Sequence, residues 1–249
     1  MTGPITTVNY IKPTISANPI LERVVLVAVA LMAVGAAVLS IRDARAAYVR
    51  ELGIEAVAQA LDMERSAQRD RLLDSAQDRL TEALDVYSRD PVLWRAMALT
   101  RYLQATGAQV TDVSPPLLRA TVDAARHAEA LDPHDPEAPG RIAQALSVLP
   151  QADKAQAAAA LKRSYLQRAL DPASGAWRIQ TAAALWPALD AETRESALAE
   201  ACIIARGGAA GQTQMQTIAA ADPGMTAAWT TVTRQTSCAY GGLIQSPGN

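Results

Sequence analysis

The segment ALDPHDPEAP, residues 130–139, interrupts a chain that otherwise favours helix over most of its length. Proline moves the preceding residue out of the helical region of backbone space, and its own fixed φ suits the first turn of a helix. An Asp-Pro pair therefore predicts that one helix ends and the next begins. The same pair recurs in SRDPVLW (88–94), ALDPASGAW (169–177) and AADPGMTAAW (220–229).

The junction prolines divide the chain into intervals of similar length. Pro91, Pro133, Pro172 and Pro223 lie about 40 to 50 residues apart, and each interval can hold a pair of helices. Alanine fills about a fifth of the chain and is the strongest helix former, whereas β-branched residues are sparse after residue 41. The sequence therefore predicts an all-α fold.

Two segments between junctions show the periodicity of helices with one buried face, because apolar residues recur every three or four positions. The first segment has Ala158, Leu161, Tyr165 and Ala169, and the second has Leu198, Ala201, Cys202 and Ala205. Asp190 can cap the start of the second helix, and the glycines at 207 and 208 can end it.

The junctions resemble those of tetratricopeptide repeats, in which a small-residue helix ends in Asp-Pro and the next helix opens with a large aromatic. Residues 128–133 read Ala-x-x-Leu-Asp-Pro and residues 168–172 read Arg-Ala-Leu-Asp-Pro, while Trp177 and Trp229 follow the junction prolines closely. The resemblance covers about residues 90–236. It departs from the family in its longer period and in lacking the expected Gly-Tyr positions of the first helix.

The resemblance implies a stack of helix pairs that binds proteins or peptides on a concave surface. An irregular helical bundle with the same junctions is the alternative. On the repeat interpretation, Trp177 and Trp229 each wedge between the two helices of their own pair, because an alanine-rich pair has few other large side chains to fill the gap.

An uncharged run of eighteen residues, VVLVAVALMAVGAAVLSI, occupies positions 24–41. As a helix it is about 27 Å long, close to the roughly 30 Å hydrocarbon core of a bilayer, and it lacks the polar stripe of a soluble helix. We therefore expect a transmembrane helix. The expected organisation is an N-terminal tail over 1–18, the transmembrane helix over 19–41, a long helix continuing over 42–89, a helical-repeat domain over 90–236 and a flexible C-terminal tail over 237–249.

The apolar run is longer than the core of a usual signal peptide, and only Lys12 and Arg23 precede it as cations, which favours an uncleaved anchor. The triplet Ala44-Arg45-Ala46 offers a cleavage site, so removal as a signal peptide is the alternative. A long domain can cross the membrane largely regardless of its charge. We therefore expect a single-pass protein of the inner (plasma) membrane, with its large domain on the extracytoplasmic side.

The charge of the chain predicts no nucleic-acid partner. The formal net charge is -2 and the pI is near 5.7, whereas binding a phosphate backbone requires a clustered basic surface. Four arginines between residues 65 and 79 alternate with acidic residues. This pattern predicts a solvated, salt-bridged helix face.

Residues that could carry catalysis or hold a cofactor are sparse. His127 and His134 are the two histidines, with the helix-ending Pro133 between them and no cysteine nearby, whereas a zinc site needs four converging ligands. Asp132 and Asp135 lie in one turn and are interpreted as capping groups. The sequence has no Gly-rich phosphate loop and no G-x-S-x-G or H-E-x-x-H motif. We expect no metal, no cofactor and no enzymatic activity.

Cys202 and Cys238 are the two cysteines of the chain and are candidates for a disulfide. Cys202 lies in an apolar helical stripe, and Cys238 lies in the Gly-rich tail SCAYGGLIQSPGN (237–249). In an oxidising compartment a bond would pin this tail to the preceding helices. Two free thiols are the alternative, because sequence spacing does not show whether the Cα atoms come within bridging distance.

These features favour a helical scaffold that is anchored in the membrane by residues 19–41. It would recruit protein partners, themselves membrane or envelope proteins. The setting would be a bacterial-type cell-envelope assembly, such as surface-polysaccharide synthesis or export, secretion or chaperoning. ALWPALDAETRESALAEA (184–201) also resembles segments of anchored repeat proteins associated with polysaccharide export. The alternatives are an accessory subunit of an integral membrane complex, with the span and residues 1–18 docked onto other subunits, and an enzyme built from scattered residues.

Overall fold

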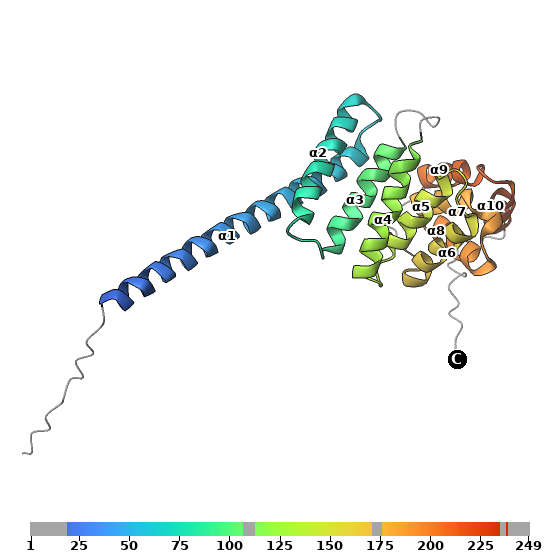
Figure 1. Cartoon of the computed structure of the whole chain (residues 1–249). Coiled ribbons are helices and arrows are strands. Elements are labelled where there is room, and N and C mark those ends of the chain that lie inside the picture. Colours follow the sequence, from blue (N-terminus) through green and yellow to red (C-terminus); the bar gives the residue numbers. More distant parts are fainter. Residues whose placement is uncertain (1–18, 107–112, 171–175, 235–237, 239–249) are drawn as a thin grey trace, which may run out of the picture. The chain divides into compact units, whose positions relative to one another are not determined.

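The computed structural model of the chain describes residues 19–106, 113–170, 176–234 and 238. The junction at 171–172 and the expected tails lie outside these residues, apart from Cys238. The chain divides into two units, Met1–Arg45 and Ala46–Asn249, which are described separately. All regular secondary structure in the described residues is helical, which confirms the all-α prediction (Figure 1).

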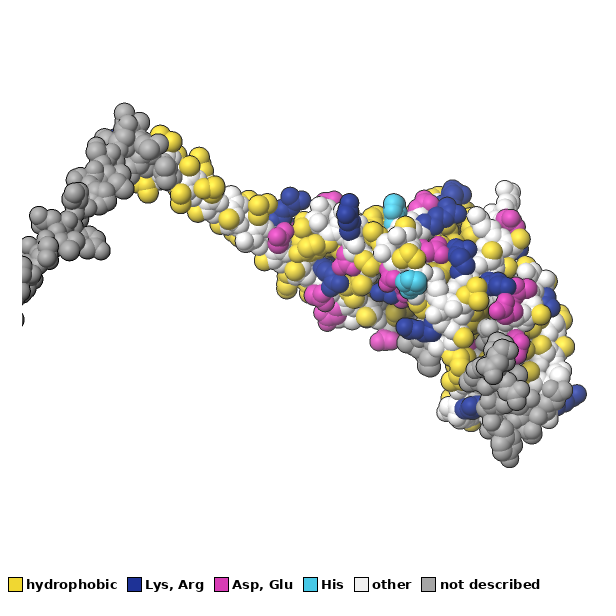
Figure 2. Space-filling view, turned by 90° about the horizontal axis from the view of Figure 1, so that it is seen from below, with side chains coloured by type: hydrophobic (Ala, Val, Ile, Leu, Met, Phe, Trp, Pro, Cys, Tyr) yellow, Lys and Arg dark blue, Asp and Glu magenta, His cyan; other side chains and the backbone are white. Residues whose placement is uncertain are grey.

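Helix α1, Pro19–Asp62, contains the apolar run. From Leu26 onward it is long and apolar enough to cross a membrane. The large apolar side chains described between Val24 and Ile41 keep 51% to 69% of their accessible surface (Figure 2). A core helix of a soluble protein buries such side chains, whereas the described residues leave this part of α1 exposed.

The second unit consists of the C-terminal part of α1 and the helices that follow it. Its described residues form nine further α-helices and one turn of 3-10 helix, η2. These elements are α2 (Ala67–Leu84), α3 (Pro91–Ala105), α4 (Pro115–Leu131), α5 (Glu137–Val148), α6 (Lys154–Gln167), α7 (Ala176–Ala184), η2 (Trp186–Ala188), α8 (Ala191–Ala205), α9 (Ala209–Ala219) and α10 (Pro223–Arg234).

Consecutive helices pack as hairpins within this unit. Helix α3 packs along α4, α5 along α6 and α7 along α8, while α9 contacts both α8 and α10 (Figure 1). The first helices of neighbouring pairs also contact each other, α3 with α5, α5 with α7 and α7 with α9. Helices α3, α5, α7 and α9 are therefore neighbours along one side of the stack.

The prediction of one continuous helix over 42–89 is wrong. Helix α1 ends at Asp62, and α2 begins five residues later at Ala67. Ser66 has extended backbone angles, and its hydroxyl accepts a hydrogen bond of 3.2 Å from the backbone N–H of Arg69. Such a side chain satisfies a backbone N–H that has no partner in the first turn, so Ser66 starts a new helix.

Arg69 holds α2 against the end of α1. It was expected on a solvated helix face, but it is 7% exposed and donates from Nε to the carbonyl oxygen of Ala60 at 2.9 Å. The guanidinium thereby satisfies a carbonyl in the last turn of α1. The compact unit accordingly begins at Ala46, and not at residue 90 as expected.

Two Asp-Pro junctions start helices as predicted. Helix α3 begins at Pro91, where the carboxylate of Asp90 accepts a hydrogen bond of 2.8 Å from the N–H of Val92. Helix α10 begins at Pro223, and the carboxylate of Asp222 accepts an N–H of its first turn at 3.0 Å. In both places the acid supplies the acceptor that the first turn lacks.

The junction at Pro133 ends a helix without opening the next. Helix α4 stops at Leu131, but α5 begins only at Glu137, because Pro136 of the second Asp-Pro pair holds the N-cap position. The last interval also differs, since it holds α7, α8 and α9. Pro223 therefore opens the second helix of the final hairpin and not a new pair.

The predicted ends of α8 are confirmed. Asp190 holds the N-cap position, and its carboxylate accepts the N–H of Thr193 at 2.8 Å. Helix α8 ends at Ala205, just before the predicted glycines. Arg206 holds its C-cap position with helical backbone angles, and Gly208, with a φ of +106°, holds the N-cap position of α9.

The core of the second unit combines alanines with a limited set of larger side chains. Ala158, Leu161 and Tyr165 of the predicted α6 stripe are buried, whereas Ala169 is exposed beyond the helix end. Small side chains allow helix backbones to approach closely, so cores of this kind reach high density with few bulky residues. The largest fully buried apolar side chains are Leu73, Leu80, Leu93, Met97, Leu118, Leu161, Ile179, Leu185, Met215 and Met225.

A buried ion pair joins three helices. Arg178 of α7 is fully buried and Glu200 of α8 is 2% exposed, and two parallel hydrogen bonds of 2.6 and 3.0 Å connect them. The guanidinium also donates to the carbonyls of Arg168 and Ala169 at the end of α6, at 2.9 and 3.2 Å. Tyr165 of α6 donates to Glu200 at 3.1 Å, and burial raises the pKa of this phenol well above its ordinary value.

The two tryptophans of the predicted repeat pattern occupy different environments. Trp177 packs on α5 and does not wedge between α7 and α8. Its ring lies so close to Gly140 of α5 that a Cβ on this glycine would be only 2.6 Å away, and the Arg141 guanidinium lies 4.0 Å from the ring centroid. The glycine provides the space into which this ring packs. Trp229 is 6% exposed, so it is buried as expected, but it belongs to the second helix of its hairpin.

We expect Arg178→Met to lower the free energy of unfolding by about 3 to 5 kcal/mol, because it leaves the Glu200 carboxylate buried and unpaired. The double variant Arg178→Met/Glu200→Leu should recover most of this loss, since neither charge then needs a partner. Urea denaturation of the full chain in mild detergent, followed by circular dichroism, measures both variants. A double variant that loses as much stability as Arg178→Met alone, or more, would contradict the coupling.

Candidate functional site

An apolar groove lies between α1 and α3, with a contribution from α5. Its volume is about 190 Å³. All of its residues belong to the unit that begins at Ala46. The lining residues, called the groove below, are Ile54, Val57, Ala58, Leu61, Val92, Arg95, Ala96, Leu99 and Glu137.

The α1 wall of the groove is one helix face. Ile54, Ala58 and Leu61 are spaced by four and three residues, which places their side chains above one another. Val57 is 3% exposed and belongs to the core, whereas Leu61 remains 52% exposed. This wall therefore presents apolar surface that the described residues leave uncovered.

The α3 wall follows from where that helix begins. Because the Asp90 cap fixes the start of α3, Leu93 and Met97 point into the core and are at most 1% exposed. The residues of α3 that line the groove are Val92, Ala96 and Leu99. They have the same four- and three-residue spacing as the α1 residues, so their side chains also share one helix face. Helix α3 thus packs into the core with one face and borders the groove with the next.

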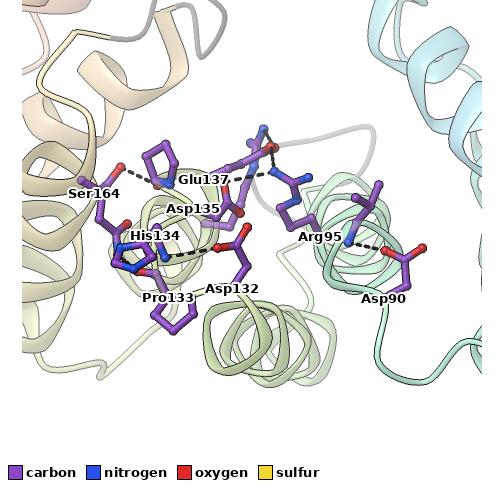
Figure 3. A network of polar contacts seen from close by, with 12 residues as sticks. Asp90, Arg95, Asp132, Pro133, His134, Asp135, Glu137 and Ser164 are labelled. Atoms are coloured by element: carbon purple, nitrogen blue, oxygen red, sulfur yellow. Dashed lines mark hydrogen bonds and ion pairs between the residues drawn. The ribbon is translucent and has the colours of Figure 1, made fainter.

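A charged cluster borders this wall (Figure 3). Arg95 of α3 lies 3.0 Å from the carboxylate of Asp135 and 3.7 Å from that of Glu137, which begins α5. Asp135 also accepts the backbone N–H of Glu137 at 3.2 Å, as expected for a capping acid. Burial raises the pKa of Asp135, and the positive charge of Arg95 opposes this rise.

The polar contacts continue along α5. Arg141 is 7% exposed and donates to Glu137 at 3.2 Å and to Gln144 at 2.8 Å. Burial lowers the pKa of Arg141 and raises that of the neighbouring Tyr102 phenol. These contacts pair most of the charged groups with one another, although Asp135 Oδ2 and Arg141 Nε are buried without a hydrogen-bond partner.

The structure joins the two cysteines as a disulfide. Cys202 of α8 and Cys238 have an S–S distance of 1.96 Å and a Cα–Cα distance of 5.0 Å. This Cα distance lies within the range that a disulfide can bridge. The bond lies at the last helices, and neither cysteine lines the groove.

The two histidines lie apart from the groove lining. His127 is on the exposed side of α4, where its ring stacks on that of Trp94 with centroids 4.6 Å apart. His134 is exposed, and its backbone N–H donates to the carboxylate of Asp132 at 3.3 Å (Figure 3). Within the described part of the chain, no three His, Cys, Asp or Glu side chains are grouped so that they could hold a metal ion.

Sequence reasoning missed the groove because its walls come from helices far apart in the chain. The spacing of Ile54, Ala58 and Leu61 was a readable signal, as was that of Val92, Ala96 and Leu99. Periodicity of this kind marks an apolar helix face, but it does not tell a face that another helix covers from one that stays open.

Comparison with known proteins gives no match: no family model, curated protein or solved structure is detectably similar to this chain. The assignment of function therefore depends on the chain's own chemistry and geometry.

Removing the charge of Arg95 should make stability depend more strongly on pH. Arg95→Met removes the largest influence that opposes the rise in the pKa of Asp135, so burial raises this pKa further in the variant. A carboxyl whose pKa is raised on folding favours the folded state only while it is protonated. The variant should therefore lose stability relative to the parent chain as the pH rises above the ordinary Asp value of 3.8, and should approach it at lower pH.

Urea midpoints of both chains in mild detergent, measured at a series of pH values, give this difference. Adding Asp135→Asn to the Arg95→Met chain should remove most of the pH-dependent part, because the titrating group is then absent. A stability difference that stays constant across the pH series would contradict the role of the Asp135 charge.

Proposed function

We propose that this protein is a membrane-anchored helical adaptor that binds protein partners in a bacterial-type cell-envelope assembly, such as surface-polysaccharide synthesis or export, secretion or chaperoning. The observation that carries the proposal is the uncovered apolar groove on a stack of helix hairpins. Exposed apolar patches bordered by polar groups are typical of interaction sites. The exposed apolar part of α1 supports anchoring in a membrane.

The proposal includes a tetratricopeptide-like arrangement of the hairpins. The contacts of α3 with α5, α5 with α7 and α7 with α9 support it, because stacked pairs bring their first helices together. The groove lies on first helices, which is where the resemblance implies partner binding. The irregular final interval, with three helices between junctions, fits this arrangement less well.

The groove fits an amphipathic helix of a partner protein. Its walls offer apolar residues at the spacing that receives the anchor residues of a bound helix. Exposed positions beside them on α1 carry acidic groups, at Glu51, Glu55 and Asp62. A partner helix with a basic flank would therefore match the charge at this border. We propose binding rather than catalysis as the activity of this surface.

The large domain is proposed to face the extracytoplasmic side of the inner membrane. The disulfide supports this side, because such bonds persist in oxidising compartments and are rare in the cytosol.

An accessory subunit of an integral membrane complex is the second candidate. The observation that favours it is the small-residue content of the apolar helix, where a Cβ on Gly35 would meet no atom within 4 Å. Small residues allow membrane helices to pack closely against one another. On this alternative, other transmembrane subunits would cover this part of α1.

We expect Leu61→Asp to weaken partner binding at least about tenfold, because it places a charge in an apolar contact. Leu166→Asp is the matched control, since Leu166 is also exposed, at 63%, but lies on α6 outside the groove. The measurement is quantitative co-purification of both variants and the parent chain from membranes in mild detergent. Equal retention of envelope partners by all three chains would contradict the groove as their site. Stoichiometric transmembrane subunits retained by all three would instead favour the second candidate.

Sidedness can be tested at the same exposed position. In a chain that carries Leu166→Cys, a membrane-impermeant maleimide added to intact spheroplasts should label the new thiol, because the native cysteines are bonded to each other. Labelling that requires permeabilised membranes would place the domain in the cytoplasm. Permeabilised spheroplasts serve as the control that the thiol can react.

A further inference from the structure

The final helices of the chain lie inside a covalently closed loop. The Cys202–Cys238 bond joins α8 to a residue beyond α10, over a sequence separation of 36 residues. Helices α9 and α10 both lie within this loop. Arg206 adds a second tie at the same place, because its Nε donates to the carbonyl oxygen of Cys238.

The non-covalent contacts of this last hairpin with α8 and η2 depend on close approach at two glycines. Its large buried side chains are Met215, Ile218, Met225 and Trp229. Gly224 of α10 packs closely against the Trp186 ring, because a Cβ on this glycine would lie only 2.9 Å from the ring. At the other contact, a Cβ on Gly211 would overlap the carbonyl oxygen of Ile204, so α9 reaches α8 only because this residue is glycine.

A hollow lies between the last hairpin and α8. Its volume is about 550 Å³, and its lining includes Cys202, Trp229 and Cys238 together with polar residues of α9 and α10. Side chains that border a hollow lose the dispersion contacts that close packing supplies. The packing of α9 and α10 on α8 is therefore loose beside the disulfide.

Length adds to this weakness. Helix α9 has 11 residues and α10 has 12, and helices this short are marginal in water unless tertiary packing supports them. The covalent loop is a further constraint on the position of this hairpin, because it limits the freedom of the undocked segment.

We propose that the Cys202–Cys238 disulfide is a reducible clamp that keeps the α9–α10 hairpin docked on α7 and α8. Reduction releases this hairpin while the helices before it stay folded. Release uncovers the apolar surface around Trp186 and Ala205, which the hairpin borders in the oxidised chain. This inference is independent of the groove, because neither cysteine lines it.

The reductant required is a dithiol. One thiolate of the dithiol attacks Sγ of Cys238, which is partly exposed, whereas Cys202 is 2% exposed. The S–S bond breaks and Cys202 leaves as a thiolate that takes up a proton. The second thiolate of the dithiol then attacks the mixed disulfide, forms a cyclic disulfide and releases Cys238 as a thiol. Two electrons and two protons pass from the dithiol to the protein.

Hydrogen exchange measured by mass spectrometry on the full chain in mild detergent tests the clamp. After treatment with dithiothreitol, amides in 209–219 and 223–234 should exchange faster by a factor on the order of 100, while those of α3 to α6 keep their rates. The double variant Cys202→Ser/Cys238→Ser should show the same fast exchange without reductant and no further change with it. This control removes any effect of the reagent on the rest of the chain.

Three outcomes would overturn the proposal. Unchanged exchange in α9 and α10 after reduction would show that non-covalent packing suffices. Equal acceleration in α3 to α6 would show that the bond supports the whole stack and not the last hairpin. Thiol titration that finds two free thiols in the untreated chain would remove the clamp altogether. None of these measurements involves a partner protein, so they leave the proposed adaptor function unaffected.

Discussion

Glu200 and Arg178 are charged groups without access to water, and the arrangement of α6, α7 and α8 depends on their mutual neutralisation. A buried charge is tolerated only when a partner and hydrogen bonds replace its hydration. The guanidinium meets this requirement from three sides, with the carboxylate on α8 and two carbonyls at the end of α6. Because every contact has a fixed direction, the pair sets the relative positions of three helices whose alanine surfaces alone would permit several packings.

The helix contacts on either side of this ion pair depend on the sizes of the side chains and not on their charges. On one side the Trp177 ring fills the space that Gly140 leaves on α5, with Arg141 stacked on the ring. On the other side Trp186 meets Gly224 of the last hairpin. A large ring against a glycine lets backbones approach while the volume is still filled. At α1 and α3 no such ring is present in the groove lining, and the apolar walls remain open there.

Several elements could be predicted because their causes are local. The all-helical fold follows from alanine content and periodicity, and the starts of α3, α8 and α10 follow from an acid that caps the first turn at Asp90, Asp190 and Asp222. The break before α2 was missed even though Ser66 is a common capping residue, because the charge pattern around it suits a continuous helix equally well. Arg69 stabilises the break between α1 and α2 through its hydrogen bond to the carbonyl oxygen of Ala60. This contact forms only in the folded chain, so the sequence pattern does not reveal it.

The sequence by itself determined that the chain is helical, that its N-terminal helix carries an apolar segment long enough to span a membrane, and where most junctions fall. These properties depend on residues within a few positions of each other, whose backbone preferences and hydrophobicity act locally. Only the tertiary structure decided that Arg178 and Glu200 meet in the core, that Trp177 packs on α5, that Cys202 lies within bonding distance of Cys238, and that Ile54 and Leu61 face Val92 across an open groove. The physical reason is that a helical period fixes which residues share a face, whereas the partner of that face depends on how distant helices pack.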